Sequence, residues 1–213
     1  MPNNLLIFGD SYSTFKNYVP NGYAVYYYEE GRPETDVTKV NETWWHKVLT
    51  AKNLNLILND SWSGSTIGYT GYGNADNSET SSFICRLNKM INNGFFEKNE
   101  INTVFVFGGT NDSWSNAPLG ELKYDNFEKQ ELYSVLPAIG CFFGKLKETL
   151  PNADIYCLIN TELNTEISLA LKTVSQKYDI TTVEFEHIAK NSGHPTIKGM
   201  EDIATGVLKA MDK

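Results

Sequence analysis

The sequence predicts an α/β protein in which helices cover both faces of a five-stranded parallel sheet, giving three α/β/α layers. Two observations predict this fold. Short apolar segments bounded by Gly, Asn or Asp recur along the chain, and segments with helical spacing of apolar residues lie between them. The chain has 213 residues, of which 41% are hydrophobic, so we expect a single domain over residues 1–213.

Five segments have the length and the β-branched or aromatic content of strands: residues 4–8, 54–60, 102–109, 153–160 and 179–185. Helical spacing is found in residues 43–53, 81–94, 128–150 and 195–211. Pro137 must kink or interrupt the third of these helical patterns, because proline lacks the N–H that a helix interior uses. Strands that alternate with helices indicate a doubly wound parallel sheet.

Two stretches do not fit the alternation, and both are expected to be long loops. Residues 16–43 are rich in tyrosine, and residues 112–126 contain Trp114. Long loops inside a compact domain are usually functional or disordered. The aromatic content favours a binding surface over slack chain.

Charge and cysteine content exclude several function classes. The 18 Lys and Arg against 26 Asp and Glu give a net charge of −8, which argues against a nucleic-acid partner. Cys85, Cys141 and Cys157 lie far apart in apolar contexts, so we expect buried free thiols in a reducing compartment. No apolar run approaches the roughly 20 residues of a membrane helix, and the amino terminus lacks the pattern of a signal peptide. We therefore expect a cytoplasmic protein with no membrane partner.

Polar motifs follow four of the predicted strands. These are "GDSYS" with Ser11, "NDSWSGSTIG" with Gly64, "GGTND" with Asn111 and "NSGHPTIKG" with His194. Each motif alone is consistent with ordinary turn chemistry. The carboxyl ends of parallel strands meet at one edge of the sheet, however, so these four residues are expected to share a crevice.

These residue types suit a hydrolytic site. A serine hydroxyl becomes a good nucleophile when a neutral imidazole takes its proton. The N–H groups of Ser11 and Gly64 and the amide of Asn111 are candidate donors to a tetrahedral oxyanion. Pro195 favours an extended backbone at His194, and Thr196 can cap the final helix, so the imidazole is expected on a stiff junction.

With these four blocks in this order, the sequence resembles the SGNH hydrolases, also called the GDSL esterase/lipase family. The resemblance covers residues 4 to about 208. It implies the flavodoxin-like strand order 2-1-3-4-5 and hydrolysis of an ester or related acyl bond without a metal or organic cofactor. It also implies that Ser11 is the nucleophile, that His194 is the base, and that Ser11, Gly64 and Asn111 form the oxyanion hole.

One position departs from the family pattern. The family usually has Asp three residues before the histidine, where this chain has Asn191. Asn can accept the imidazole N–H but gives no negative charge to an imidazolium. Three arrangements stay open: support of His194 by Asn191 or a backbone carbonyl, a replacement carboxylate with Glu162 as the first candidate, or a weakened or inactive site.

Side chains near the motifs are candidates for contact with substrate. Tyr12, Trp62, Trp114 and the "YAVYYY" run at residues 23–28 could form aromatic walls that suit sugar rings or small acyl groups, although core packing is the alternative for such residues. Asp10 is a further candidate beside Ser11. Its ordinary role, like that of Asp112, is to orient a loop through backbone hydrogen bonds, since no metal-ligand spacing accompanies either residue.

The sequence therefore predicts a serine esterase or deacylase that hydrolyses a small ester, such as an O-acylated carbohydrate, through an acyl-enzyme intermediate. The alternatives are a carbohydrate- or metabolite-binding protein that lacks turnover, and an acyltransferase with the same residues. The acyl group, the alcohol and the oligomeric state are not indicated.

Overall fold

The sheet of the computed structural model, which describes residues 3–213, is parallel throughout and has the order β2-β1-β3-β4-β5. Its strands are β1 (Asn3–Gly9), β2 (Leu54–Ser61), β3 (Thr103–Phe107), β4 (Asp154–Ile159) and β5 (Thr181–Glu184). The predicted three-layer fold, the strand segments and the strand order are confirmed. Of the region predicted as one domain, residues 1 and 2 lie outside the described part.

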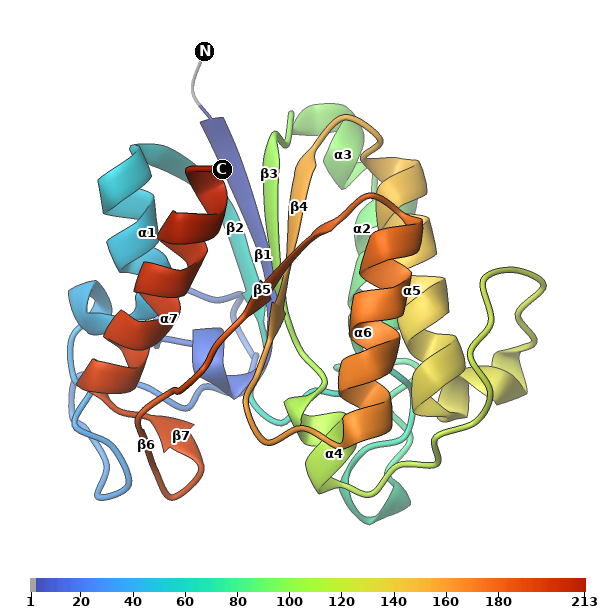
Figure 1. Ribbon diagram of the computed structural model, residues 1–213, viewed down its shortest axis with the longest axis horizontal. Helices are drawn as coiled ribbons and strands as arrows, with labels where there is room; N and C mark the ends of the chain where they lie inside the picture. Colours follow the sequence, from blue (N-terminus) through green and yellow to red (C-terminus); the bar gives the residue numbers. More distant parts are fainter. Residues whose placement is uncertain (1–2) are drawn as a thin grey trace.

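Helices cover both faces of the sheet (Figure 1). They are α1 (Trp44–Lys52), α2 (Phe83–Asn92), α3 (Phe95–Lys98), α4 (Thr110–Trp114), α5 (Val135–Thr149), α6 (Thr165–Lys177) and α7 (Ile197–Met211). Helices α1 and α7 pack together on one face, and α2, α5 and α6 lie on the other. Shorter elements are the 3-10 helices η1 (Ser11–Ser13), η2 (Val40–Glu42), η3 (Tyr72–Asn74) and η4 (Lys129–Tyr133), and the hairpin of β6 (Lys190–Asn191) and β7 (His194–Pro195).

The core is divided by the sheet because successive strand residues point to opposite faces. In β1, Leu6 and Phe8 pack with the α2, α5 and α6 side, and Leu5 and Ile7 pack with the α1 and α7 side. All four side chains are fully buried. The central strand is therefore fixed on both faces, and its carboxyl end is a rigid support for the residue that follows.

Three local predictions need correction. Helix α6 is missing from the prediction, although Ile167, Leu171 and Val174 are spaced for one buried face. The pattern over 128–150 is interrupted as expected, but α5 begins at Val135, so Pro137 lies in its first turn, where no intrahelical N–H bond is lost. The predicted loop 112–126 begins inside α4.

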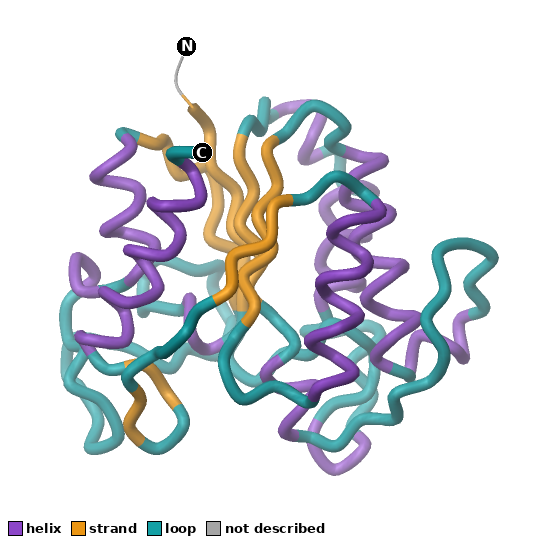
Figure 2. Tube along the Cα trace, viewed as in Figure 1, coloured by secondary structure: helices purple, strands orange, loops and turns teal. Residues whose placement is uncertain are grey.

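The loops gather mainly at the carboxyl end of the strands, together with the β6–β7 hairpin (Figure 2). Residues 16–43 are largely loop, with η2 near their end. Cys85, Cys141 and Cys157 are free and buried, as predicted. Within residues 3–213, no helix is long and apolar enough to cross a membrane.

Candidate active site

Four residues predicted for the site lie on elements that follow the strand ends. Ser11 begins η1 after β1, and Gly64 lies in the loop after β2. Asn111 is in α4 after β3, and His194 is in β7, before α7. Thr196 caps α7 by accepting a hydrogen bond from the N–H of Gly199, as predicted.

The structure brings Ser11 and His194 together. The imidazole Nε2 lies 3.1 Å from the Ser11 Oγ, across 183 residues of sequence. Ser11 is 2% exposed and held in a tight turn, because the Asp10 carboxylate accepts the N–H of Tyr12 at 3.0 Å. Gly9 permits this turn, since a Cβ there would lie 2.4 Å from the Ser61 hydroxyl. The two side chains predicted as nucleophile and base are therefore within hydrogen-bond reach of each other.

A two-residue hairpin turn supports the imidazole. Ser192 and Gly193 both have positive φ, 48° and 80°, as the tight turn between β6 and β7 requires. The turn places the Ser192 carbonyl 3.4 Å from Nδ1 of His194. Asn191 is exposed, and its Oδ1 accepts the Ser192 hydroxyl at 3.5 Å. Of the arrangements left open by the sequence, the geometry matches support by a backbone carbonyl.

Glu162, the first candidate for a replacement acid, is not brought to His194. Its carboxylate lies 3.1 Å from the Lys190 ammonium, and its side chain is 78% exposed. Lys190 also donates to the hydroxyl of Thr161 at 2.7 Å. Within residues 3–213, the hydrogen-bond partners of the imidazole are Ser11 and Ser192.

Replacing Glu162 with Gln is expected to leave kcat/KM for ester hydrolysis within about twofold of wild type, since an exposed ion pair contributes little. Steady-state kinetics on a nitrophenyl ester provide the measurement. A loss of tenfold or more would show that this carboxylate supports the base after all.

The predicted oxyanion donors are available to a ligand. Within residues 3–213, the N–H groups of Ser11 and Gly64 donate to no other group. Gly64 has a φ of 83° and faces open space. The Asn111 side chain donates through Nδ2 to the Ser65 carbonyl at 2.9 Å, while its Oδ1 accepts the Tyr72 hydroxyl at 2.8 Å. The amide is thus oriented, and its second N–H is free for an oxyanion.

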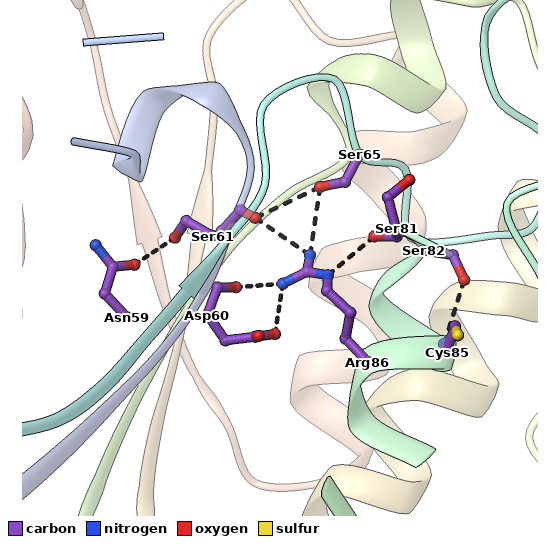
Figure 3. A network of polar contacts seen from close by, with 9 residues as sticks. Asn59, Asp60, Ser61, Ser65, Ser81, Ser82, Cys85 and Arg86 are labelled. Carbon is purple, nitrogen blue, oxygen red and sulfur yellow. Dashed lines mark hydrogen bonds and ion pairs between the residues drawn. The ribbon is translucent and has the colours of Figure 1, made fainter. Parts of the chain in front are cut away.

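A buried ion pair that was not predicted, between Arg86 and Asp60, lies beside Ser65 (Figure 3). Arg86 and Asp60 are each 1% exposed, and Nη1 of Arg86 lies 2.5 Å from the Asp60 carboxylate. The guanidinium also donates to the Gly9 carbonyl at 3.2 Å and to the Ser65 hydroxyl at 3.3 Å. It therefore ties the end of β1 to the loop that carries Gly64. The signal was present, since Arg86 occupies an apolar-face position three residues after Phe83.

The carboxyls of Asp10 and Asp112 are completely buried. Burial raises the pKa of Asp10 from 3.8 to about 7 and that of Asp112 from 3.8 to about 6. Asp112 accepts the N–H groups of Ile67 and Gly68, which moderates its increase. Asp10 has one oxygen without a partner among residues 3–213. Both carboxylates accept hydrogen bonds from backbone N–H groups of loops, and neither is exposed on the surface where a substrate could contact it.

Replacing Asp10 with Asn is expected to change how stability depends on pH. Between about pH 4 and 7 the folded Asp10 binds a proton and the unfolded one does not, so its stabilising contribution is lost as pH rises through 7. Because one pKa unit corresponds to about 1.4 kcal/mol, the stability of the variant relative to wild type should increase by about 4 kcal/mol from pH 4 to 7.5.

Urea unfolding of both proteins across this pH range measures the difference. The exposed Asp125→Asn variant is the control and should follow wild type. Parallel pH curves for wild type and Asp10→Asn would contradict the assigned pKa.

The environment of His194 keeps its imidazole neutral. Burial is the main cause that lowers the pKa of His194 to about 4, and the charges of Arg32 and Lys190 lower it further. The Ser192 carbonyl and the charge of Glu34 act in the opposite direction. The ring is therefore ready to accept a proton over the whole neutral range, although it is a weak base.

The predicted aromatic candidates divide into buried and accessible groups. Tyr12 is fully buried, and its hydroxyl donates to the Gly193 carbonyl, so it anchors the hairpin. Trp114 is 41% exposed and lies edge-on to His194 at 5.7 Å. Trp62 is half-buried and packs on Tyr23, with ring centroids 4.2 Å apart. Within the described part of the chain, no group of three His, Cys, Asp or Glu side chains could hold a metal ion.

Comparison with known families agrees with this geometry. The family model of the GDSL-like lipases and acylhydrolases matches residues 3–211. The chain belongs to this family. None of the curated proteins compared with the chain matches it.

Solved structures similar to this GDSL-like protein include two from Bacteroides. A protein described as a GDSL-like lipase from Bacteroides ovatus is 39% identical, with a TM-score of 0.92 over 100% of this chain and 99% of that one. A similarly described protein from Bacteroides uniformis is 38% identical, with a TM-score of 0.90 over 99% and 96%.

A more distant likeness concerns the fold alone. A family two carbohydrate esterase from Clostridium thermocellum, solved with cellohexaose, is 16% identical, with a TM-score of 0.66 over 100% of this chain and 65% of that one. The family assignment supports an esterase or acylhydrolase.

Proposed function

We propose that this GDSL-like protein is a serine esterase or deacylase that works through an acyl-enzyme intermediate. The observation that carries the proposal is the 3.1 Å contact between the Ser11 hydroxyl and the His194 imidazole. Two backbone N–H groups predicted as oxyanion donors, those of Ser11 and Gly64, have no partner among residues 3–213, which supports the proposal. A nucleophile, a neutral base and oxyanion donors are the parts that acyl transfer requires.

In the first half of the reaction, the Ser11 Oγ attacks the carbonyl carbon of the ester while His194 Nε2 takes the hydroxyl proton. The carbonyl oxygen becomes an oxyanion, which accepts hydrogen bonds from the N–H groups of Ser11 and Gly64 and from the Asn111 amide. The carbon–oxygen bond to the alcohol then breaks, and the imidazolium returns its proton to the leaving alcohol. The product of this half is an acylated Ser11.

In the second half, water attacks the acyl carbon and His194 takes one of its protons. The same donors hold the second oxyanion. The bond to Ser11 Oγ breaks, the serine recovers its proton from the imidazolium, and a carboxylic acid leaves. Among residues 3–213, the contact at Nδ1 is the uncharged Ser192 carbonyl, so no charged group there assists the imidazolium.

For the substrate we propose a small ester, with an O-acylated carbohydrate as the leading class. Trp114 and Tyr72 are 41% and 47% exposed, and they flank the base and the Asn111 amide. Exposed rings beside polar groups suit the faces of sugar rings. The carbohydrate esterase with the same fold is consistent with this class. The buried free cysteines support a cytoplasmic location, which fractionation of the producing cells would test.

The experiment that tests the function combines a fluorophosphonate probe with a panel of nitrophenyl esters and acetylated sugars. Wild type should be labelled and should hydrolyse at least one ester, and Ser11→Ala should do neither. Folded wild type that is neither labelled nor active would favour a binding protein without turnover. Transfer of the acyl group to added alcohols in preference to water would identify an acyltransferase.

A further inference from the structure

The loop of residues 16–43 is built against the segment that carries the base. The Tyr27 hydroxyl donates to the Pro195 carbonyl at 3.0 Å, and the Asp36 carboxylate accepts the N–H of Ile197 at 2.7 Å. The N–H of Tyr26 donates to the Thr14 hydroxyl at 2.9 Å, just after the turn of Ser11. The loop thus joins the nucleophile turn to the base, and it is not slack chain.

Within this loop, Tyr26 forms a parallel stack with the imidazole of His194. The ring centroids are 3.5 Å apart and the planes differ by 4°. The Arg32 guanidinium lies 4.1 Å from the centroid of the same tyrosine ring. Both groups cannot occupy one face at these distances, so Tyr26 lies between Arg32 and His194. Tyr26 is only 8% exposed, and the stack is therefore held in place by packing.

The stack restrains tilting of the His194 imidazole, which the hydrogen bonds of that ring leave free. In a Ser-His-Asp site, a carboxylate on Nδ1 fixes the orientation of the imidazole. Here the hydrogen-bond partner of Nδ1 within the described part of the chain is the Ser192 carbonyl, at a long 3.4 Å. A flat ring held parallel at van der Waals distance cannot tilt, so Nε2 stays directed at Ser11.

We propose that Tyr26, backed by Arg32, is the positioning residue that orients the imidazole of His194 in place of a triad carboxylate. The proposal rests on the proposed hydrolytic function.

Charged groups around the imidazole of His194 act on its protonation in both directions. Arg32 and Lys190 disfavour the imidazolium, Glu34 favours it, and Glu34 lies 3.1 Å from Nε of Arg32. The ring stacked on His194 is part of the packing that buries the imidazole, and burial is the main cause that lowers its pKa. Removing that ring should both loosen the imidazole and raise its pKa toward the ordinary value of about 6.5.

The test compares Tyr26→Leu with Tyr26→Phe, which keeps the stacked ring. Tyr18→Leu makes the same change at an exposed position of the same loop and is the matched control. Tyr26→Leu should lower kcat per fluorophosphonate-titrated site by about 10- to 100-fold, with KM within about threefold. The acid limb of its kcat/KM profile should move from near pH 4 toward pH 6.5. The other two variants should stay within about threefold of wild type with unmoved limbs.

Two results would overturn the proposal. One is a Tyr26→Leu enzyme with unchanged kcat per titrated site. The other is a Tyr26→Leu protein in which fluorophosphonate titrates fewer active sites, with no other defect and with the pH profile of wild type. Tyr26 would then have a purely structural role. Inactive, unlabelled wild type would instead overturn the proposed function, and this proposal with it. Labelling and activity of the wild-type protein therefore distinguish a failure of this proposal from a failure of the proposed function.

Discussion

Replacing His194 with Ala is expected to lower kcat for ester hydrolysis by about 10³-fold, the usual contribution of general acid–base catalysis. The imidazole lies within hydrogen-bond distance of the Ser11 hydroxyl at 3.1 Å. In the proposed mechanism it both takes and returns the proton in each half of the reaction. Without it, the hydroxyl must lose its proton to water. The residual rate should come from the oxyanion donors and binding alone.

Steady-state kinetics per folded protein measure this loss, and the acid limb of the pH profile should disappear in the variant. His46→Ala is the matched control, since His46 lies on α1 and its Nδ1 lies 3.5 Å from the Thr50 hydroxyl. Its kcat should equal that of wild type. Retention of more than a tenth of wild-type kcat in His194→Ala would mean that another group is the base.

Replacing Arg86 with Met is expected to lower the free energy of unfolding by about 3 to 5 kcal/mol, because it leaves the buried Asp60 carboxylate without its partner. The substitution also removes hydrogen bonds to Gly9 and Ser65. Because the backbone carbonyl of Ser65 accepts a hydrogen bond from the Asn111 amide, we expect kcat to fall as well. Urea unfolding and kinetics are the measurements.

The double variant Asp60→Leu with Arg86→Met separates the two effects. It removes both charges, so it should recover much of the lost stability. The recovery of kcat should be smaller, since the contacts to Gly9 and Ser65 stay absent. Lys89→Met on the exposed side of α2 is the control and should unfold like wild type. A single Arg86 variant as stable as wild type would contradict the role of the ion pair.

The fold and the main site could be predicted because they depend on local patterns. The alternation of short apolar strands with helical segments determines a parallel sheet, and the motifs that follow the strands then share one edge. Ser11 and His194 could be paired on this basis without any distance information. Helix α6 was missed even though Ile167, Leu171 and Val174 carry its pattern.

The support of the base could not be predicted, because it depends on contacts between distant segments. Nothing near His194 in the sequence indicates that Tyr26 stacks on its ring, since the two are brought together by a loop without regular structure. Glu162 was predicted as a replacement for the missing acid, but its carboxylate pairs with the Lys190 ammonium instead. A carbonyl such as that of Ser192 has no sequence signature, because every residue has one.

The wide separation of Ser11 and His194 along the chain makes the proposed turnover depend on the packing of two distant segments, which lie 183 residues apart. The serine alone is not enough for turnover until the segment that carries the imidazole has packed against it. Local unfolding of the β6–β7 hairpin and of α7 would abolish the proposed turnover while the central strands are still folded. Loss of turnover on heating should therefore precede loss of the circular dichroism signal.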